Sequence, residues 1–456
     1  FETVILPNNA QSITTRIKEV SKAIRFVYAS TFFQEPKSFL ASDHVHLGSE
    51  QMAVVIQRLV GRRRGERFYP DISGVAQSYN YYPVGALKAH EGLVTSVLGL
   101  GSTVAEGMRA LRFSPRRPKV LPQMSSPTYA LRSSQRQFSA LDLSDLTPWS
   151  AEHSALRLFD LDVAEQDGTL ESVGATYDAN DDRIYDTIYR DGLRIVNFAQ
   201  VLKFGRFPLA AILDDLLTVF KNGLGTEVEM EFAVSLNEGG ERPELAVLQV
   251  RPLVARYDSG QVDLDEMRQS HRVLVDGPAI GHGAFSDIRD FIFVNPSTFE
   301  VSETRAMAQA IGEMNGRLVK EGRPYLLLLP GRIGTEDPWL GVPVAWNQVS
   351  GARTMIEVST RSHWVDPSQG SHFFHNITSL KVGYFNLDLT RSDHVLDLEW
   401  LNSLTVVEEI ASVCRVELET GLEIRIDGAE GHGVMGYFWG THPTLPPSQV
   451  PPPFID

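Results

Sequence analysis

The chain has 456 residues and a single cysteine, Cys414, so an internal disulfide is impossible. This excludes the disulfide-stapled secreted domains and favours a reducing compartment, for which the cytoplasm is the simplest expectation. Long apolar runs are also missing: the stretch at 325–330 (YLLLLP) is far shorter than the roughly 20 residues that a membrane-spanning helix needs. We therefore expect no membrane partner.

Basic residues are in deficit. Forty-two Lys and Arg stand against 57 Asp and Glu, which gives a net charge of −15. Such a charge opposes nonspecific binding to nucleic acid, although local groups can still bind a small anion. The sequence also contains no G-x-S-x-G and no HExxH motif. A homo-oligomer is left open.

An apolar content of 43% is typical of a globular protein with an ample core. The chain opens on Phe1 within a strand-like segment, so we expect the remainder of a longer polypeptide, with simple processing as the alternative. A polar, acidic stretch after Arg256 resembles a linker. The domains predicted are therefore 1–256, a mixed α/β region at 257–440, and a Pro-rich tail at 441–456.

Periodicity predicts the local elements. Helices are expected at 13–33, from Pro208 to Gly223 or Gly225, and around Cys414 (VVEEIASVCRVEL). Strands are expected at 53–60, 76–82, 227–236 and 245–254. Residues 61–74 are expected to form a loop with Arg62, Arg63 and Arg64 at a solvated tip, and phosphate contacts by these arginines are the alternative.

The two strands at 227–236 and 245–254, joined by NEGGERPE, form the most informative pattern. Because alternate side chains of a strand share a face, pairing can bring Glu229 and Glu231 near Gln249 and Arg251. Two carboxylates and an amide oxygen suit Mg²⁺, and an arginine suits the phosphate that Mg²⁺ bridges. The alternative is an ordinary amphipathic hairpin with a solvated polar face. By strict alternation, the residues predicted for the polar face of the second strand are Leu245, Val247, Gln249 and Arg251.

A GLG run offers a second candidate. Gly99 and Gly101 would let backbone N–H groups approach an anion, with a helix starting at Ser102. A plain turn is the alternative, because no GK[ST] follows.

Several segments together resemble the ATP-grasp nucleotide-binding domain of phosphoenolpyruvate synthase and pyruvate phosphate dikinase. They are VYASTF, AVVIQRLV, GVAQSYNYYP, GLGSTVAEG with RFSP, and EMEFAV with VLQVRPLV, and they span roughly the first 255 residues. The resemblance implies an α/β (α+β) fold that begins with an ATP-grasp-like region. It implies that Glu231 and Gln249 bind the metal ions of Mg-ATP and that Arg251 touches the phosphates. It further implies that Glu229 replaces the usual aspartate and that Gln57 lies on the strand leading to the adenine pocket.

The implied function is an ATP-dependent phosphotransferase with ATP and Mg²⁺ as cofactors, Arg251 as the catalytic residue and an unknown phosphoryl acceptor. A non-catalytic nucleotide sensor or assembly module is the alternative. Ser102 and Arg116 stand where the family has acidic residues, and the family's glycine-rich start would lie upstream of Phe1.

The family's phosphate-carrying histidine motif is missing. His372 comes closest, but Phe373 and Phe374 follow it where the family has small residues, so we predict a structural role. A metal pair of His372 and His375 has no third ligand in sight.

In the second region, the loop RIGTEDPWLGVPVAW offers Arg332, Glu336, Asp337 and Trp339 as a candidate second site. A structured interdomain loop is the alternative.

Overall fold

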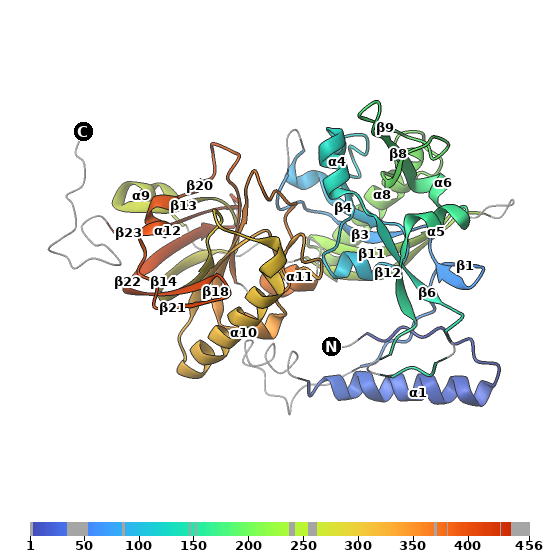
Figure 1. Ribbon diagram of the computed structural model, residues 1–456, viewed down its shortest axis with the longest axis horizontal. Helices are drawn as coiled ribbons and strands as arrows, with labels where there is room; N and C mark the ends of the chain where they lie inside the picture. Colours follow the sequence, from blue (N-terminus) through green and yellow to red (C-terminus); the bar gives the residue numbers. More distant parts are fainter. Residues whose placement is uncertain are drawn as a thin grey trace. The chain divides into compact units, whose positions relative to one another are not determined.

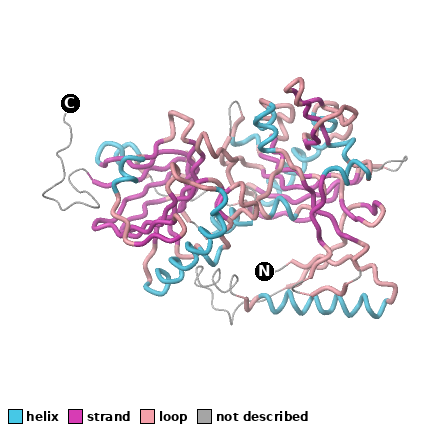
Figure 2. Tube along the Cα trace, in the orientation of Figure 1, coloured by secondary structure: helices cyan, strands magenta, loops and turns pink. Residues whose placement is uncertain are grey.

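The structure is a computed structural model that describes residues 3–33, 53–83, 87–145, 147–150, 153–236, 242–253, 262–368, 372–380, 382–428 and 430–438. The described residues divide into two compact units, one ending at Leu253 and one covering the residues from 262 onward (Figure 1). Both contain helices and strands, which confirms the predicted α+β class (Figure 2). The predicted tail at 441–456 lies outside the described residues.

The first unit is built on a five-stranded antiparallel sheet in the order β12-β11-β3-β4-β5. Its strands are β3 (Ile72–Gln77), β4 (Leu93–Val97), β5 (Leu111–Phe113), β11 (Val228–Ser235) and β12 (Glu244–Pro252). A four-stranded sheet consists of β1 (Arg62–Arg64), β2 (Arg67–Tyr69), β6 (Gln137–Asp142) and β7 (Leu156–Asp160), and a three-stranded sheet of β8 (Gly174–Asp178), β9 (Arg183–Tyr185) and β10 (Leu193–Val196). The helices are α1 (Ile13–Ser30), α3 (Ser102–Ala105), α4 (Pro127–Ser133), α5 (Leu161–Gln166), α6 (Leu170–Val173), α7 (Ala199–Leu202) and α8 (Leu209–Leu224).

Helix α8 covers one face of the five-stranded sheet. Its apolar stripe, Leu209, Leu213 and Leu217, is buried in the same core as the apolar side chains of β11. The helix starts after Pro208, and Gly225 ends it with a φ of 69°, a left-handed conformation that glycine adopts without steric cost. The sequence prediction for this helix is confirmed.

The arginine-rich segment differs from its prediction. It is not a loop but a hairpin, in which β1 pairs with β2. Arg63 is exposed, whereas Arg64 donates to Asp71 at 2.5 Å from a largely buried position. The expectation of three solvated arginines is thus wrong for Arg64. The strand expected at 53–60 is also wrong, because this segment joins no ladder.

The second unit is a closed barrel. Its strands follow the order β14-β15-β18-β19-β13-β23-β22, and β22 pairs again with β14. The strands and short pairs are β13 (His271–Ile280), β14 (Gly283–Val294), β15 (Tyr325–Pro330), β16 (Arg332–Ile333), β17 (Gly341–Val342), β18 (Ala352–Ser359), β19 (Gly383–Asp388), β20 (Val395–Leu396), β21 (Glu408–Ile410), β22 (Val413–Asp427) and β23 (His432–Phe438). The helices are α9 (Leu264–Ser270), α10 (Thr304–Glu321), α11 (His372–Ser379) and α12 (Leu398–Ser403).

Four neighbouring strands of the barrel, β14, β15, β18 and β19, run parallel. Parallel neighbours need crossover connections, and α10 and α11 lie in two of them. Phe373 and Phe374 of α11 are buried, as predicted. The side chains of His372 and His375 lie outside what the structure describes, so the structural role of His372 stays a prediction.

The helix expected around Cys414 is wrong. Cys414 lies in β22, which forms a hairpin with β21 through a turn at Ala411 and Ser412. Both turn residues have positive φ, 48° and 63°, as a two-residue hairpin turn requires. The barrel decides this segment, since β22 pairs with β14 as well as with β23.

Candidate functional site

The candidate site lies on the face of the five-stranded sheet opposite α8. The side chains Val228, Met230, Phe232 and Val234 of β11 point into the core. Because strand side chains alternate, Glu229 and Glu231 point to the other face. Part of that face is covered by Val104 of α3, which packs on Val75 and Val97. The polar groups of β11 and β12 lie beside this cover.

The first row of this face contains Arg251, Glu229 and Gln77, which are register partners on three adjacent strands. Nε of Arg251 donates to Oε1 of Glu229 at 2.7 Å, and its Nη2 donates to the same oxygen. Nε2 of Gln77 donates to Oε2 of Glu229 at 2.6 Å. Glu229 is only 4% exposed, so both oxygens of a buried carboxylate are occupied by protein donors.

The second row contains Gln249 and Glu231, which are also register partners, as predicted. Among the described residues, no hydrogen bond or ion pair reaches either side chain. Burial raises the pKa of the Glu231 carboxyl, the nearby Arg251 charge opposes this, and the Glu229 charge adds to it. Glu231 is therefore a half-buried carboxyl with no hydrogen-bond or ion-pair partner in the described part of the chain, beside an amide oxygen and an arginine.

A β-bulge corrects the predicted faces of β12. The register shifts between Glu231 and Phe232, so that Phe232 pairs with Val247 and Leu248 is the extra residue. A one-residue shift reverses the alternation. Leu245, expected on the polar face, instead packs against the core. The bulge leaves Gln249 and Arg251 on the polar face.

Gln57 reaches the same bulge. Its Nε2 donates to the backbone carbonyl of Leu248 at 2.8 Å, although the segment 53–60 forms no strand. The exposed side chain thus lies against the edge strand that bears Gln249 and Arg251.

The GLG run has a packing explanation. Gly99 has a φ of 90°, and a Cβ there would lie 2.5 Å from the carbonyl oxygen of Ser139 in β6. Glycine is therefore required for the close approach of two backbones. Gly101 precedes α3, which has only four residues. The structure adds no support for an anion site there.

Sequence analysis missed a polar pocket at the end of β3. Ser78 donates to Glu227 at 2.6 Å, and Lys221 donates to the same carboxylate. Arg116 pairs with Asp214 across the pocket at 3.0 Å. The lining residues are Ser78, His90, Glu91, Gly92, Pro115, Arg116, Asp214, Leu217, Thr218 and Lys221. Because Arg116 and Lys221 each have a carboxylate partner, we do not interpret the pocket as an anion site.

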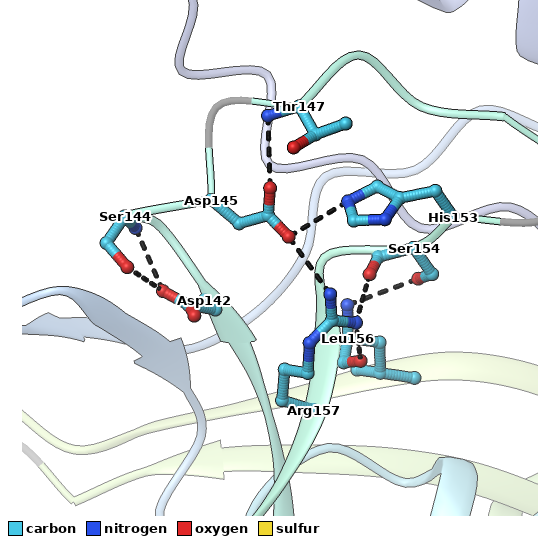
Figure 3. A network of polar contacts seen from close by, with 8 residues as sticks. All are labelled: Asp142, Ser144, Asp145, Thr147, His153, Ser154, Leu156 and Arg157. Atoms are coloured by element: carbon cyan, nitrogen blue, oxygen red, sulfur yellow. Dashed lines mark hydrogen bonds and ion pairs between the residues drawn. The ribbon is translucent and has the colours of Figure 1, made fainter.

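A histidine–aspartate pair in the loop between β6 and β7 was also missed (Figure 3). Asp145 accepts from the backbone N–H of Thr147 at 3.0 Å and lies 2.9 Å from Nε2 of His153. Nη2 of Arg157 donates to it at 3.0 Å. The Thr147 backbone N–H is the main group that holds the pKa of Asp145 below its usual range. The network fixes the loop whose Trp149 packs edge-on against α1.

The second unit has its own buried carboxylate, which the sequence did not single out. Glu357 of β18 is 2% exposed and accepts from the backbone N–H of Ile333 at 2.7 Å. The Ser368 hydroxyl donates to the same oxygen, and Nδ2 of Asn386 donates to the other at 3.1 Å. Burial raises the pKa of this carboxyl, and the hydrogen bonds oppose that rise.

The predicted second site does not gather on the surface. Arg332 is buried, and its Nε donates to the backbone carbonyl of Asp366 at 2.7 Å. Glu336 is exposed, and Trp339 is 68% exposed, with its backbone N–H bonded to Asp337. Arg332 thus anchors the loop through a buried hydrogen bond, whereas Trp339 lies on the surface, so the two do not form one site.

Two further observations bear on ligands. In the part of the chain that the structure describes, no three His, Cys, Asp or Glu side chains are grouped to hold a metal. Glu231 and Gln249 would therefore need further ligands, and phosphate oxygens are the usual ones for Mg²⁺. No helix among the described residues is long and apolar enough to cross a membrane.

Comparison with known families gives a match over most of the first unit. A family model described as pyruvate phosphate dikinase, AMP/ATP-binding domain, matches residues 11–272, which is more than half of the chain. The match contains both rows of the polar face and extends through α9. No curated protein matches the chain.

Proposed function

The chain belongs to the pyruvate phosphate dikinase AMP/ATP-binding domain family, and from this we propose that it binds Mg-ATP on the polar face and transfers a phosphoryl group. The observation that supports this best is the pairing of Glu231 with Gln249, with Arg251 two residues along the same strand and on the same face. A carboxylate that no described residue pairs with, an amide oxygen and a guanidinium are the groups that a metal-bound polyphosphate requires.

Each residue has a distinct part in this proposal. Glu231 and Gln249 would hold Mg²⁺, which neutralises charge on the phosphates when bound. Arg251 would donate to a phosphate oxygen, because its Nη1 makes no hydrogen bond among the described residues. Gln57, against β12, would lie toward the adenine end. The phosphoryl acceptor is not identified.

The test is ligand-induced stabilisation of the full chain. Mg-ATP should raise the unfolding temperature, because a ligand that binds only the folded state stabilises it by mass action. Glu231→Gln should reduce the shift, whereas Glu66→Gln, which removes the same charge from an exposed position, should leave it unchanged. A full shift in Glu231→Gln would refute the assignment of the site.

A second candidate is nucleotide binding without transfer. It is favoured by the absence of a histidine in the family's carrier context. Incubation with ATP labelled at the β and γ phosphates separates the two functions. Label on protein or on a second small molecule supports transfer, whereas unchanged ATP under saturating conditions supports the binding module.

A further inference from the structure

Gln77 lies on the polar face but is not among the residues proposed to bind Mg-ATP. Gln77 ends β3 and is 1% exposed. Its amide reaches Glu229 on the neighbouring strand, and Glu229 in turn reaches Arg251 on the next. The three side chains thus form a continuous chain of contacts across β3, β11 and β12.

The division of the Glu229 oxygens sets the orientation of Arg251. A guanidinium beside a free carboxylate commonly pairs with both oxygens at once. Here Gln77 occupies Oε2, so that Nε and Nη2 of Arg251 both bind Oε1. This leaves Nη1 free of hydrogen bonds among the described residues. The side chain of Arg251 is 21% exposed and that of Glu229 is 5% exposed. Solvent therefore reaches the guanidinium but not the carboxylate.

We propose that Gln77 is a positioning residue that holds Arg251, through Glu229, in the orientation that binds phosphate. Gln77 itself does not touch the ligand. Without its amide, Oε2 of Glu229 would be a buried acceptor without a donor, and burial without a partner is unfavourable. The carboxylate would then turn both oxygens to Arg251 and draw the guanidinium toward β11. The role of Arg251 as a phosphate ligand rests on the proposed function, whereas the orientation of Arg251 by Gln77 and Glu229 does not.

The variants follow from the geometry. Gln77→Met keeps the length of the side chain and removes the donor. Gln77→Glu keeps the shape and supplies a donor only while the new carboxyl shares a proton with Glu229, as paired carboxyls do. Ser78→Ala is the matched control. It removes the hydrogen bonds that the neighbouring Ser78 hydroxyl makes to Glu227 and from the Val228 N–H, and it touches neither Glu229 nor Arg251.

The first readout needs no ligand. In the full chain labelled with ¹⁵N-arginine, the Nε–H signal of Arg251, assigned with Arg251→Lys, reports its bond to Glu229. We expect Gln77→Met to shift this signal and speed its exchange with water, and Ser78→Ala to leave it unchanged. Gln77→Glu should resemble the wild type only while the new carboxyl is protonated. Once ionised, it lacks the donor and adds a negative charge beside Glu229, so the Arg251 signal should shift. An unchanged signal in Gln77→Met and in Gln77→Glu at every pH would overturn the proposal.

The second readout is the dissociation constant of Mg-ATP. We expect Gln77→Met to raise it roughly tenfold, as loss of one well-placed charged hydrogen bond does, and Ser78→Ala to leave it within about twofold. If the wild type binds no Mg-ATP, the proposed function fails and the arginine signal alone decides the positioning role. If the wild type binds and Gln77→Met binds equally well, the positioning role is refuted while the function stands.

Discussion

Two glutamates, one in each unit, have opposite surroundings. In the second unit, Glu357 is surrounded by donors from its own protein, namely the Ile333 backbone, Ser368 and Asn386. In the first unit, Glu231 sits half-buried on a sheet face with no donor among the described residues. Both carboxyls have a raised pKa because of burial.

The difference indicates what each carboxyl is for. A buried carboxylate with its full set of donors connects the loops that supply them, and its loss should be felt as instability. A carboxylate without donors costs stability, and this is a cost that functional sites commonly incur. The contrast predicts opposite responses to mutation, which the following experiments test.

The largest effect is expected for Glu357→Ala. The substitution leaves the donors of Ile333, Ser368 and Asn386 buried without an acceptor, so the free energy of unfolding should fall by about 3–5 kcal/mol. Chemical denaturation of the full chain measures this. Glu336→Ala, at an exposed position in the loop that follows Ile333, is the control and should change stability by less than about 0.5 kcal/mol. Equal effects of the two variants would contradict the structural role of Glu357.

The second-largest effect is expected in the first unit, where the neighbouring arginines Arg63 and Arg64 differ in burial. Arg64→Ala removes the charged partner of the buried Asp71, whose other oxygen keeps the Leu236 N–H, and should cost about 2 kcal/mol. Arg63→Ala removes an exposed pair with Glu66 and should cost under about 0.5 kcal/mol. Thermal unfolding of both variants gives the comparison. If Arg63→Ala were costly and Arg64→Ala neutral, the assignment of Arg64 as the buried arginine and Arg63 as the exposed one would be wrong.

Glu231→Gln should act in two directions. The free protein should become more stable at neutral pH, because a half-buried charge without a partner is removed. The affinity for Mg-ATP should fall about tenfold or more, equivalent to roughly 1.4 kcal/mol, because a hard anionic ligand is lost. Calorimetry and thermal unfolding of the same sample test both. A variant that is both less stable and unchanged in affinity would place Glu231 among the structural carboxylates.

The smallest effect is a slope with pH. Since the folded-state pKa of Glu231 is raised, the folded protein holds this proton more tightly than the unfolded chain does. The protonated Glu231 therefore contributes to the stability of the folded protein. This contribution is fully present below the unfolded pKa of about 4.5 and is lost as pH rises through the folded pKa.

Mg-ATP affinity should rise over the same window, because the metal needs the ionised form. Stability measured against pH for wild type and Glu231→Gln isolates this slope, because the other carboxyls, Glu357 among them, titrate in both proteins. Parallel curves would show that Glu231 does not titrate as described.

The sequence was most informative where local order decides the structure. The stripe of Leu209, Leu213 and Leu217 predicts α8, because 3.6-residue periodicity requires only neighbours along the chain. The alternation around Glu229 and Glu231 likewise predicts the polar face of β11. The family resemblance then adds Glu231, Gln249 and Arg251 as candidates for the site.

Other features depended on partners distant in the chain. The sequence around Cys414 fits a helix as readily as a strand, and pairing of β22 with β14 decides between them. The bulge at Leu248 reversed the predicted faces of the β12 residues that precede it, such as Leu245. The sequence contains no residue at this position that indicates a bulge.

The sequence by itself determined an acidic chain without an internal disulfide, α8, the β11–β12 hairpin, and the residues Glu231, Gln249 and Arg251 as a candidate set. Only the tertiary structure decided that Glu229 is shared between Gln77 and Arg251, and that none of the residues it describes donates to Glu231. The physical reason is that hydrogen-bond donors are supplied across strands separated by about 150 residues in sequence. Periodicity tells which face a side chain takes, but only the folded sheet brings the residue that satisfies it.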